Sequence, residues 1–293
     1  MRKTSISRRV FLAIDAIIMI FLMIVCLYPL IYVCIASVSD SIKLVANTGL
    51  LWKPLGFNLE AYRAVVRNPM VVSGYMNTII VLVCGVTLNI FMTSLAAYFL
   101  SRKSEIMLKG PIMAMMIFTM YFSGGMIPGF INIKNLGLYN SLLALILPGA
   151  ISTYNLIIMR TSFQSIPASL EEAAHLDGAS HFSILWHIIL PLSKAIIAVM
   201  ILYYGVGIWN SWFPASIYLN DRSKYPLQLV LREILLQNDV SNMAQNAGVS
   251  ESYSVSESIK YAVVVVATLP ILCIYPFLQK YFVKGVMIGA LKG

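Results

Sequence analysis

Six long apolar runs constrain this chain more than any other feature of its sequence. A helix needs about 20 apolar residues to cross the hydrocarbon core of a bilayer. The strands of a membrane barrel would instead alternate polar and apolar residues over about ten positions. Asn77 and Asn89 interrupt the second run, and Gly124 and Gly125 interrupt the third. We predict transmembrane helices at residues 10–37, 73–101, 111–128, 141–162, 195–217 and 259–279.

Composition supports a membrane protein and excludes several other classes. Of the 293 residues, 59% are apolar and 11% are charged. A soluble globular domain carries roughly 45–50% apolar and about 25% charged residues. So few charges cannot cover a water-facing surface on a chain of this length. The composition therefore excludes an ordinary soluble domain, a disordered chain and a nucleic-acid-binding module.

The distribution of charge predicts which side of the membrane each end of the chain occupies. Cytoplasmic loops are enriched in Lys and Arg. With the N-terminus inside, the cytoplasmic segments carry twelve bases against four acids, and the external segments carry nine against seven. We therefore predict that both termini are cytoplasmic. The formal net charge of +9 then reflects topology and does not indicate a nucleic-acid partner.

The sequence contains no recognisable catalytic or metal-binding motif. It lacks a phosphate-binding P-loop, a Gly-x-Ser-x-Gly nucleophile motif and a His-Glu-x-x-His zinc motif. His175, His181 and His187 are six residues apart. That spacing separates neighbours by about 120° around a helix axis, so we expect no shared face and no metal site. The sequence predicts neither an enzyme nor a cofactor or metal bound by this chain.

The cytoplasmic loop at 163–194 is long and has its own helical pattern. Pro167 suits the first turn of a helix, and Glu171 and Glu172 suit the positive end of the helix dipole. Gly178 can adopt the left-handed conformation that ends a helix. We predict a second short helix at 180–189 that ends before Pro191.

The first of these two helices has two possible roles. Its small alanines and paired acids could fit a groove of another protein. Alternatively, it could be an amphipathic surface helix that caps the bundle. The residues alone favour neither role over the other.

The external loop at 218–258 divides into an apolar part and a polar part. The apolar positions recur at helical spacing, which predicts a helix on the membrane surface. They are Leu227, Val230, Leu231, Ile234 and Leu235. The segment 237–258 is rich in Asn, Ser and Gln. It could be a flexible linker.

A motif in the cytoplasmic loop resembles a known family. The loop resembles the EAA motif of ATP-binding-cassette (ABC) importer permeases. The motif is carried by Glu172-Ala173-Ala174, then Gly178 after three residues, and Ile188-Ile189-Leu190-Pro191 after nine more. Other segments resemble the carbohydrate-uptake branch similar to the maltose permease MalG, and within it the complex-oligosaccharide subgroup that includes an alginate importer permease. These segments are 122–128, 136–138, 146–148, 209–213, 225–228 and 283–293.

The resemblance implies a fold and a set of partners. The fold is an all-α integral membrane domain over 1–293, with the six transmembrane helices and cytoplasmic coupling helix of a type I ABC importer permease. The partners are a second, non-identical permease subunit, two ATPase subunits that bind ATP and Mg²⁺, an extracytoplasmic solute-binding protein, an oligosaccharide and the lipid membrane. The location is the bacterial cytoplasmic membrane.

The resemblance also implies functional residues. The cytoplasmic loop would couple this subunit to the ATPases, through Glu171, Glu172, Ala173, Ala174, Asp177, Gly178, Ile188 and Pro191. The segment 237–258 would probe the cleft of the binding protein.

Sugars are usually held by aromatic faces and amides, and polar groups within spans tend to face a water-filled path. We therefore expect the translocation path to include Asn89, Asn155, Tyr203, Tyr204, Trp209 and Asn210. An aromatic belt at the membrane interface is the alternative, and it is favoured for Trp212.

An ion-gradient-driven secondary transporter of a small polar solute is the competing hypothesis. Such a transporter would need acidic groups within the membrane for ion or proton coupling. Asp15 is the one acid in the predicted spans. The sequence therefore disfavours the secondary transporter, and the resemblance implies an ATP-driven importer of oligosaccharides, with alginate among the candidate substrates.

Overall fold

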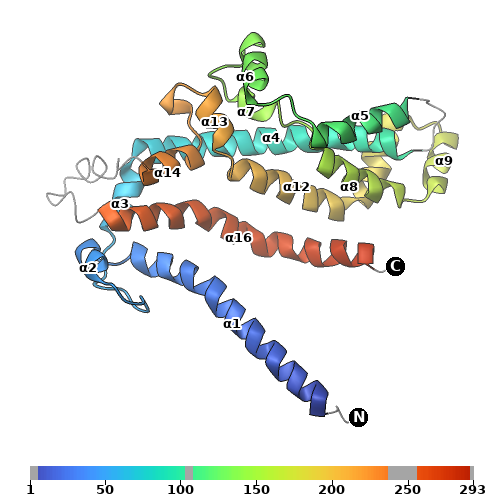
Figure 1. Ribbon diagram of the computed structural model, residues 1–293. Helices are drawn as coiled ribbons and strands as arrows, with labels where there is room; N and C mark the ends of the chain where they lie inside the picture. The colour runs from blue at the N-terminus through green and yellow to red at the C-terminus, as the bar shows by residue number, and fades with distance from the viewer. Residues whose placement is uncertain (1–5, 103–107, 237–255, 291–293) are drawn as a thin grey trace. The chain divides into compact units, whose positions relative to one another are not determined.

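The computed structural model describes residues 6–102, 108–236 and 256–290 (Figure 1). In these ranges the chain is helical, apart from loops and one isolated antiparallel bridge between Ser39 and Phe57. The chain divides into two compact units. The first comprises residues 1–69 and 233–269, and the second comprises residues 70–232 and 270–293.

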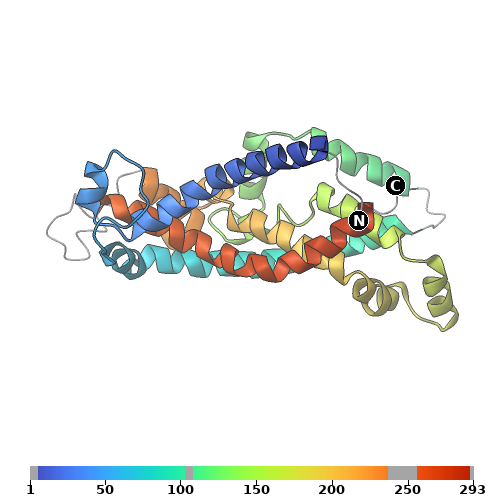
Figure 2. The ribbon, with the colours of Figure 1, turned by 90° about the horizontal axis from the view of Figure 1, so that it is seen from below.

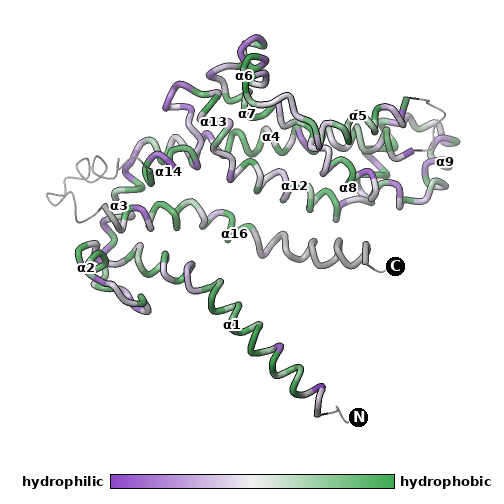
Figure 3. Tube along the Cα trace, in the orientation of Figure 1, coloured by the Kyte–Doolittle hydropathy of each residue, from purple (hydrophilic) through white to green (hydrophobic). Residues whose placement is uncertain are grey.

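The first unit is built around the C-terminal end of a long apolar helix. It contains α1 (Ile6–Ser37), α2 (Ser41–Ala46), α3 (Glu60–Arg67) and the first part of α16 (Ser256–Ala290). Its small core includes Ala36, Leu44 and Leu51. Hydrophobic residues follow most of α1 (Figure 3), and their side chains are exposed within this chain. Lipid or another protein must therefore cover α1.

The second unit begins with α4 (Pro69–Ser101), a continuous helix of 33 residues. Next come α5 (Lys109–Tyr121) and α6 (Met126–Asn135), which are bent by 117° relative to each other. The predicted span at 111–128 crosses this bend. Gly125 has φ +89°, a conformation open to glycine and strained for other residues. The two glycines that interrupt the apolar run thus mark a real break in the helix.

Two other predicted spans are also divided into shorter helices. The segment at 141–162 forms α7 (Leu143–Ile146) and most of α8 (Thr153–Gln164), and the segment at 195–217 forms α12 (Lys194–Trp209) and most of α13 (Phe213–Tyr218). Pro148, Gly149 and Pro214 lie at or beside the breaks. Such residues end helices because proline lacks an amide hydrogen and glycine is flexible.

The loop at 163–194 contains α9 (Ala168–Leu176) and α10 (His181–Ile184), with Gly178 at φ +79° between them. The predicted glycine corner is confirmed. The predicted end of the second helix before Pro191 is wrong, because the chain continues through a π-helical turn at Leu185–Ile189 into α11 (Leu190–Leu192). The wider π turn shifts the hydrogen-bond register. The chain then bends by 87° into α12.

The loop at 218–258 contains α14 (Leu227–Leu236), and the apolar face that was predicted to contact the membrane surface packs on protein instead. Leu227 and Val230 are buried against α4 at Gly74, where an added Cβ would lie 3.2 Å from the Leu227 Cα. The Leu227 amide also donates to the Thr78 hydroxyl at 2.8 Å. Helical spacing identified the apolar face correctly, but protein covers it. Most of the polar segment predicted at 237–258 lies outside the described residues.

The helices α4, α8, α10 and α12 share one hydrophobic core. Its fully buried members include Ala97, Leu156, Phe163, Ile184 and Met200. This core holds the loop at 163–194 against the longer helices. By length and composition, the described helices provide two membrane spans, Val10–Ser37 and Pro69–Ser101, or up to four if each bent pair is one span.

Candidate functional site

A cavity of about 500 Å³ lies in the second unit. Its walls come from α4, the connection between α7 and α8, α8 itself, α12 and α13. Four of the predicted path residues line it, and they were predicted from three separate apolar runs. The polar lining includes Thr78, Asn89, Ser152, Asn155, Tyr203 and Tyr204.

Tyr204 joins three walls of the cavity. Its hydroxyl lies 2.7 Å from the Thr93 hydroxyl on α4, and it accepts a 3.1 Å hydrogen bond from the Ser152 amide at the start of α8. Tyr204 and Thr93 are buried. Buried polar groups stabilise a fold when they are paired and destabilise it when they are not, so this contact fixes the position of α12 relative to α4 and α8.

The two asparagines come from two different helices, Asn89 from α4 and Asn155 from α8. When its amide is oriented to donate, the Asn89 Nδ2 reaches the Gly85 carbonyl at 2.9 Å and the Gly149 carbonyl at 3.2 Å. The backbone N–H of Asn155 donates to the Ser152 hydroxyl at 3.5 Å, and Ser152 thereby caps the start of α8. Both side chains are buried. Such groups provide uncharged hydrogen-bond donors and acceptors next to aromatic rings.

Trp209 and Asn210 lie outside this cavity. The Trp209 ring packs edge-on against Tyr75, with centroids 6.2 Å apart, and lines a separate apolar cavity. Asn210 follows the last residue of α12 and is exposed. Trp212 lies under the Arg232 guanidinium, whose carbon is 3.8 Å from the ring centroid. The predicted path residues are therefore only partly brought together.

The helix α9 is exposed over most of its surface. Glu172, Ala173, Asp177 and Gly178 are exposed, and Leu176 keeps 90% of its surface accessible. Leu176 therefore presents an accessible apolar side chain beside acidic ones. Of the other predicted coupling residues, Ala174 and Ile188 pack against the core and Pro191 is exposed.

Glu171 is buried, whereas its neighbour Glu172 is exposed. Its Oε1 lies 2.6 Å from Nε of Arg102, and the two side chains are only 12% and 16% exposed. Burial raises the pKa of Glu171 above its ordinary value, while the charges of Arg102, His175 and His181 oppose that rise. Arg102 directly follows α4, and the sequence analysis counted it only among the basic residues that predict topology. The spacing within the loop could not indicate a partner nearly 70 residues earlier.

The structure also brings together two of the histidines. The rings of His175 and His181 are 4.6 Å apart, so the expectation that these histidines lie on different faces is wrong. That expectation assumed one continuous helix, and Gly178 reverses the chain between them. No group of three or more potential metal ligands occurs among the described residues.

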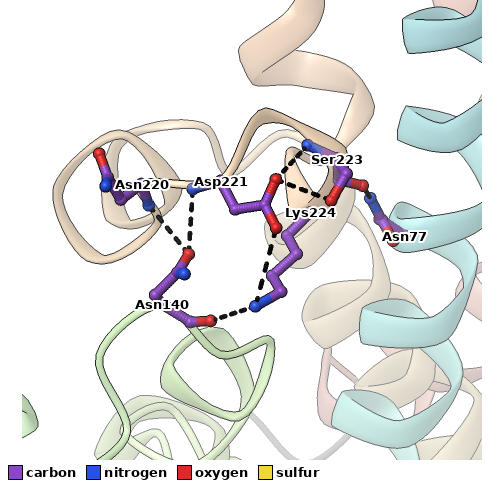
Figure 4. Close-up of polar contacts among 6 residues, drawn as sticks. All are labelled: Asn77, Asn140, Asn220, Asp221, Ser223 and Lys224. Carbon is purple, nitrogen blue, oxygen red and sulfur yellow. Dashed lines mark hydrogen bonds and ion pairs between the residues drawn. The ribbon is translucent and has the colours of Figure 1, made fainter.

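The connection between α6 and α7 lies away from α9 (Figures 1 and 2), and in it Asn140 contacts the segment that follows α13 (Figure 4). Its side-chain oxygen accepts hydrogen bonds from the amides of Asn220 and Asp221 at 3.1 and 3.0 Å. Its carbonyl accepts a 2.8 Å bond from Lys224 Nζ. Hydrogen bonds from Ser223 to Asp221 hold the pKa of that carboxyl below its ordinary value.

We expect Asn140→Ala to destabilise the assembled protein by about 1–3 kcal/mol, because two accepted hydrogen bonds are lost. Asn140 also has φ +56°, which asparagine tolerates better than alanine. Asn140→Gly is the matched control, because it relieves the backbone strain and still removes the bonds. Thermal unfolding of the purified complex measures both. An unchanged unfolding temperature for both variants would contradict the role of this contact.

Residues 81–288 match the family described as "binding-protein-dependent transport system inner membrane component". The match covers well over half of the chain. This chain belongs to that family. The resemblance seen in the EAA motif is confirmed. The protein is therefore a multi-pass inner-membrane permease subunit of a binding-protein-dependent ABC importer, and not itself an enzyme.

Individual relatives of this permease are similar over nearly its whole length. The polygalacturonan/rhamnogalacturonan transport system permease protein YtcP of Bacillus subtilis is 42% identical, with 92% of this chain and 93% of the relative covered. The protein LplC of the same organism is 41% identical, with 90% and 89% covered.

Solved structures agree with this assignment. A chain of a bacterial ABC transporter involved in the import of the acidic polysaccharide alginate superposes with a TM-score of 0.90 at 33% identity. That superposition covers 96% of this permease and 100% of the other chain. A second chain, from an alginate transporter in complex with a pentasaccharide-bound periplasmic protein, gives a TM-score of 0.53 at 16% identity and shares the fold.

Proposed function

We propose that this permease forms half of the translocation pathway of an ATP-driven importer of acidic oligosaccharides, such as fragments of pectin or alginate. The similarity to a pectic-polymer permease and to an alginate-importer chain carries this proposal. In it, the chain crosses the bacterial cytoplasmic membrane six times, with both termini inside. A second, non-identical permease subunit forms the other half.

The chemistry of the cavity supports passage of a sugar. Tyr203, with 38% of its surface exposed, presents an aromatic ring, and Asn89 and Asn155 supply amides. Aromatic faces and neutral hydrogen-bonding groups suit the apolar faces and hydroxyls of a pyranose. Such a wall guides a hydrated oligosaccharide without binding it tightly. Trp209 and Asn210 would contact substrate elsewhere along the path.

The exposed face of the cytoplasmic loop supports coupling to two ATPase subunits. In this mechanism, Glu172, Ala173 and Leu176 of α9 dock in a cleft of one ATPase, which binds ATP and Mg²⁺. Closure of the ATPase dimer displaces α9. The glycine corner at Gly178 and the buried contacts of α10 transmit that displacement to the longer helices, which then open the cavity to the external binding protein.

Reconstitution of the complex in liposomes tests the proposal. The permease is assembled with its second permease subunit, the ATPases and its binding protein. We expect labelled oligogalacturonate or oligoalginate to accumulate only with enclosed ATP and with the binding protein. Neutral maltooligosaccharides of the same length are the control, and their equal uptake would contradict the acidic substrate class.

An imposed ion gradient without ATP is the second control. Accumulation under that condition alone would favour a secondary transporter, the competing hypothesis. The scarcity of acids in the apolar runs argues against it, because ion coupling in a membrane relies on buried ionisable groups.

A further inference from the structure

One buried ion pair connects α9 to the end of α4. Arg102 directly follows the last residue of α4, and Glu171 lies in the first turn of α9. Their side-chain atoms Nε and Oε1 are 2.6 Å apart, and both side chains are largely buried. A pair shielded from water in this way is screened much less than an exposed one. It therefore restrains the two helices relative to each other.

The arginine is held in place from its own helix. The Arg102 guanidinium lies over the ring of Tyr98, one helical turn earlier, with its central carbon 5.4 Å from the ring centroid. The Tyr98 ring in turn lies 6.4 Å from that of His181 on α10. Arg102 thus moves with α4 rather than as a loose side chain. A displacement of Glu171 is transferred to the helix itself.

The same helix forms one wall of the cavity. Thr78, Val81 and Asn89 of α4 line it, and α4 has no proline after its first residue, Pro69. The rise of about 1.5 Å per residue places Arg102 about 20 Å along the axis from Asn89. A straight helix of this kind carries movement at one end to the other.

The two neighbouring acids therefore differ in what they can contact. Glu172 is exposed and faces away from the protein, whereas Glu171 faces inward to Arg102. Resting on the function proposed above, we propose that Arg102 is a positioning residue, through which Glu171 of the coupling helix moves α4 and the cavity wall. Glu171 then acts inside the permease, and Glu172 acts on the ATPase.

The experiment compares substrate imported per ATP hydrolysed in the reconstituted complex. We expect Arg102→Ala and Glu171→Ala each to lower this ratio at least about tenfold. Arg102→Lys keeps the charge and is expected to recover part of the ratio. The exchange variant Arg102→Glu with Glu171→Arg restores a pair of opposite charges. We expect it to import more substrate per ATP hydrolysed than either single variant.

Arg160 provides a matched control. Its Nε donates to the Leu100 carbonyl at 3.0 Å, so it also binds the end of α4, but from α8. Arg160→Ala is expected to lower thermal stability and to leave the ratio of uptake to hydrolysis close to that of the wild type. This contrast separates a transmitting contact from one that only stabilises.

The outcomes discriminate clearly. If the wild type transports and Arg102→Ala shows an unchanged ratio, the role of Arg102 is refuted while the proposed function stands. If the wild type shows no ATP-driven uptake, the proposed function itself fails. If the single variants do not assemble, the exchange variant decides. An assembled exchange complex that recovers the ratio of uptake to hydrolysis supports the proposal. An exchange variant that assembles without recovering the ratio, or that does not assemble, overturns it.

Discussion

Replacing Gly207 with tryptophan is expected to lower ATP-driven uptake at least about tenfold, the equivalent of about 1.4 kcal/mol in the rate-limiting barrier. Gly207 lies in α12 and lines the cavity, and a Cβ built at this position meets no atom within 4 Å. The indole would therefore enter open space in the cavity and occupy the volume that a sugar needs. The initial rate of labelled oligosaccharide uptake into proteoliposomes measures the effect.

Gly207→Ala is the matched control. Alanine adds one methyl group to the same open space and favours the helix by roughly 0.8–1 kcal/mol over glycine. We expect this variant to transport at the wild-type rate and to unfold at the same or a higher temperature. Wild-type uptake by an assembled Gly207→Trp complex would show that the substrate does not pass through this cavity.

Replacing Gly178 with proline is expected to abolish the stimulation of ATP hydrolysis by the loaded binding protein, together with uptake. Gly178 has φ +79°, and proline fixes φ near −65°. The chain then cannot make the corner between α9 and α10. The exposed face of α9 would lose its fixed direction relative to the longer helices. ATPase activity of the reconstituted complex, with and without the loaded binding protein, measures the loss.

Gly178→Asn separates the corner from the mere presence of a side chain. Asparagine tolerates the left-handed conformation better than other residues with a side chain, and a Cβ at this position meets no atom within 4 Å. We expect this variant to retain most of the stimulation. Equal loss in both variants would mean that bulk, and not backbone direction, matters at this corner. Full stimulation in Gly178→Pro would refute coupling through this corner.

The sequence predicted those parts of the molecule that depend on local residue types. Gly178 ends α9 in the left-handed conformation, as its place after the EAA residues indicated. Gly124 and Gly125 interrupt an apolar run, and the chain turns sharply there. Asn89 and Asn155 were predicted as polar groups in apolar runs, and Tyr203 and Tyr204 as aromatic groups near them. All four line one cavity.

The errors arise where distant contacts decide. The apolar face of α14 was identified, but only the fold shows that α4 covers it. His175 and His181 were assigned to different faces of one helix, whereas the glycine corner brings their rings together. Pro191 was expected to end a helix, but a π turn accommodates it. The contact between Arg102 and Glu171 joins positions that no local pattern relates.

The break between α5 and α6 has a consequence for the life of the subunit before assembly. The first amides of any helix lack partners within it, and Gly125 has no side chain to cap those of α6. Lipid cannot satisfy such groups, so neighbouring protein or water must do so. Before assembly, water reaching this break is the one source of partners for these amides, so the break favours a hydrated position until a companion subunit packs against it.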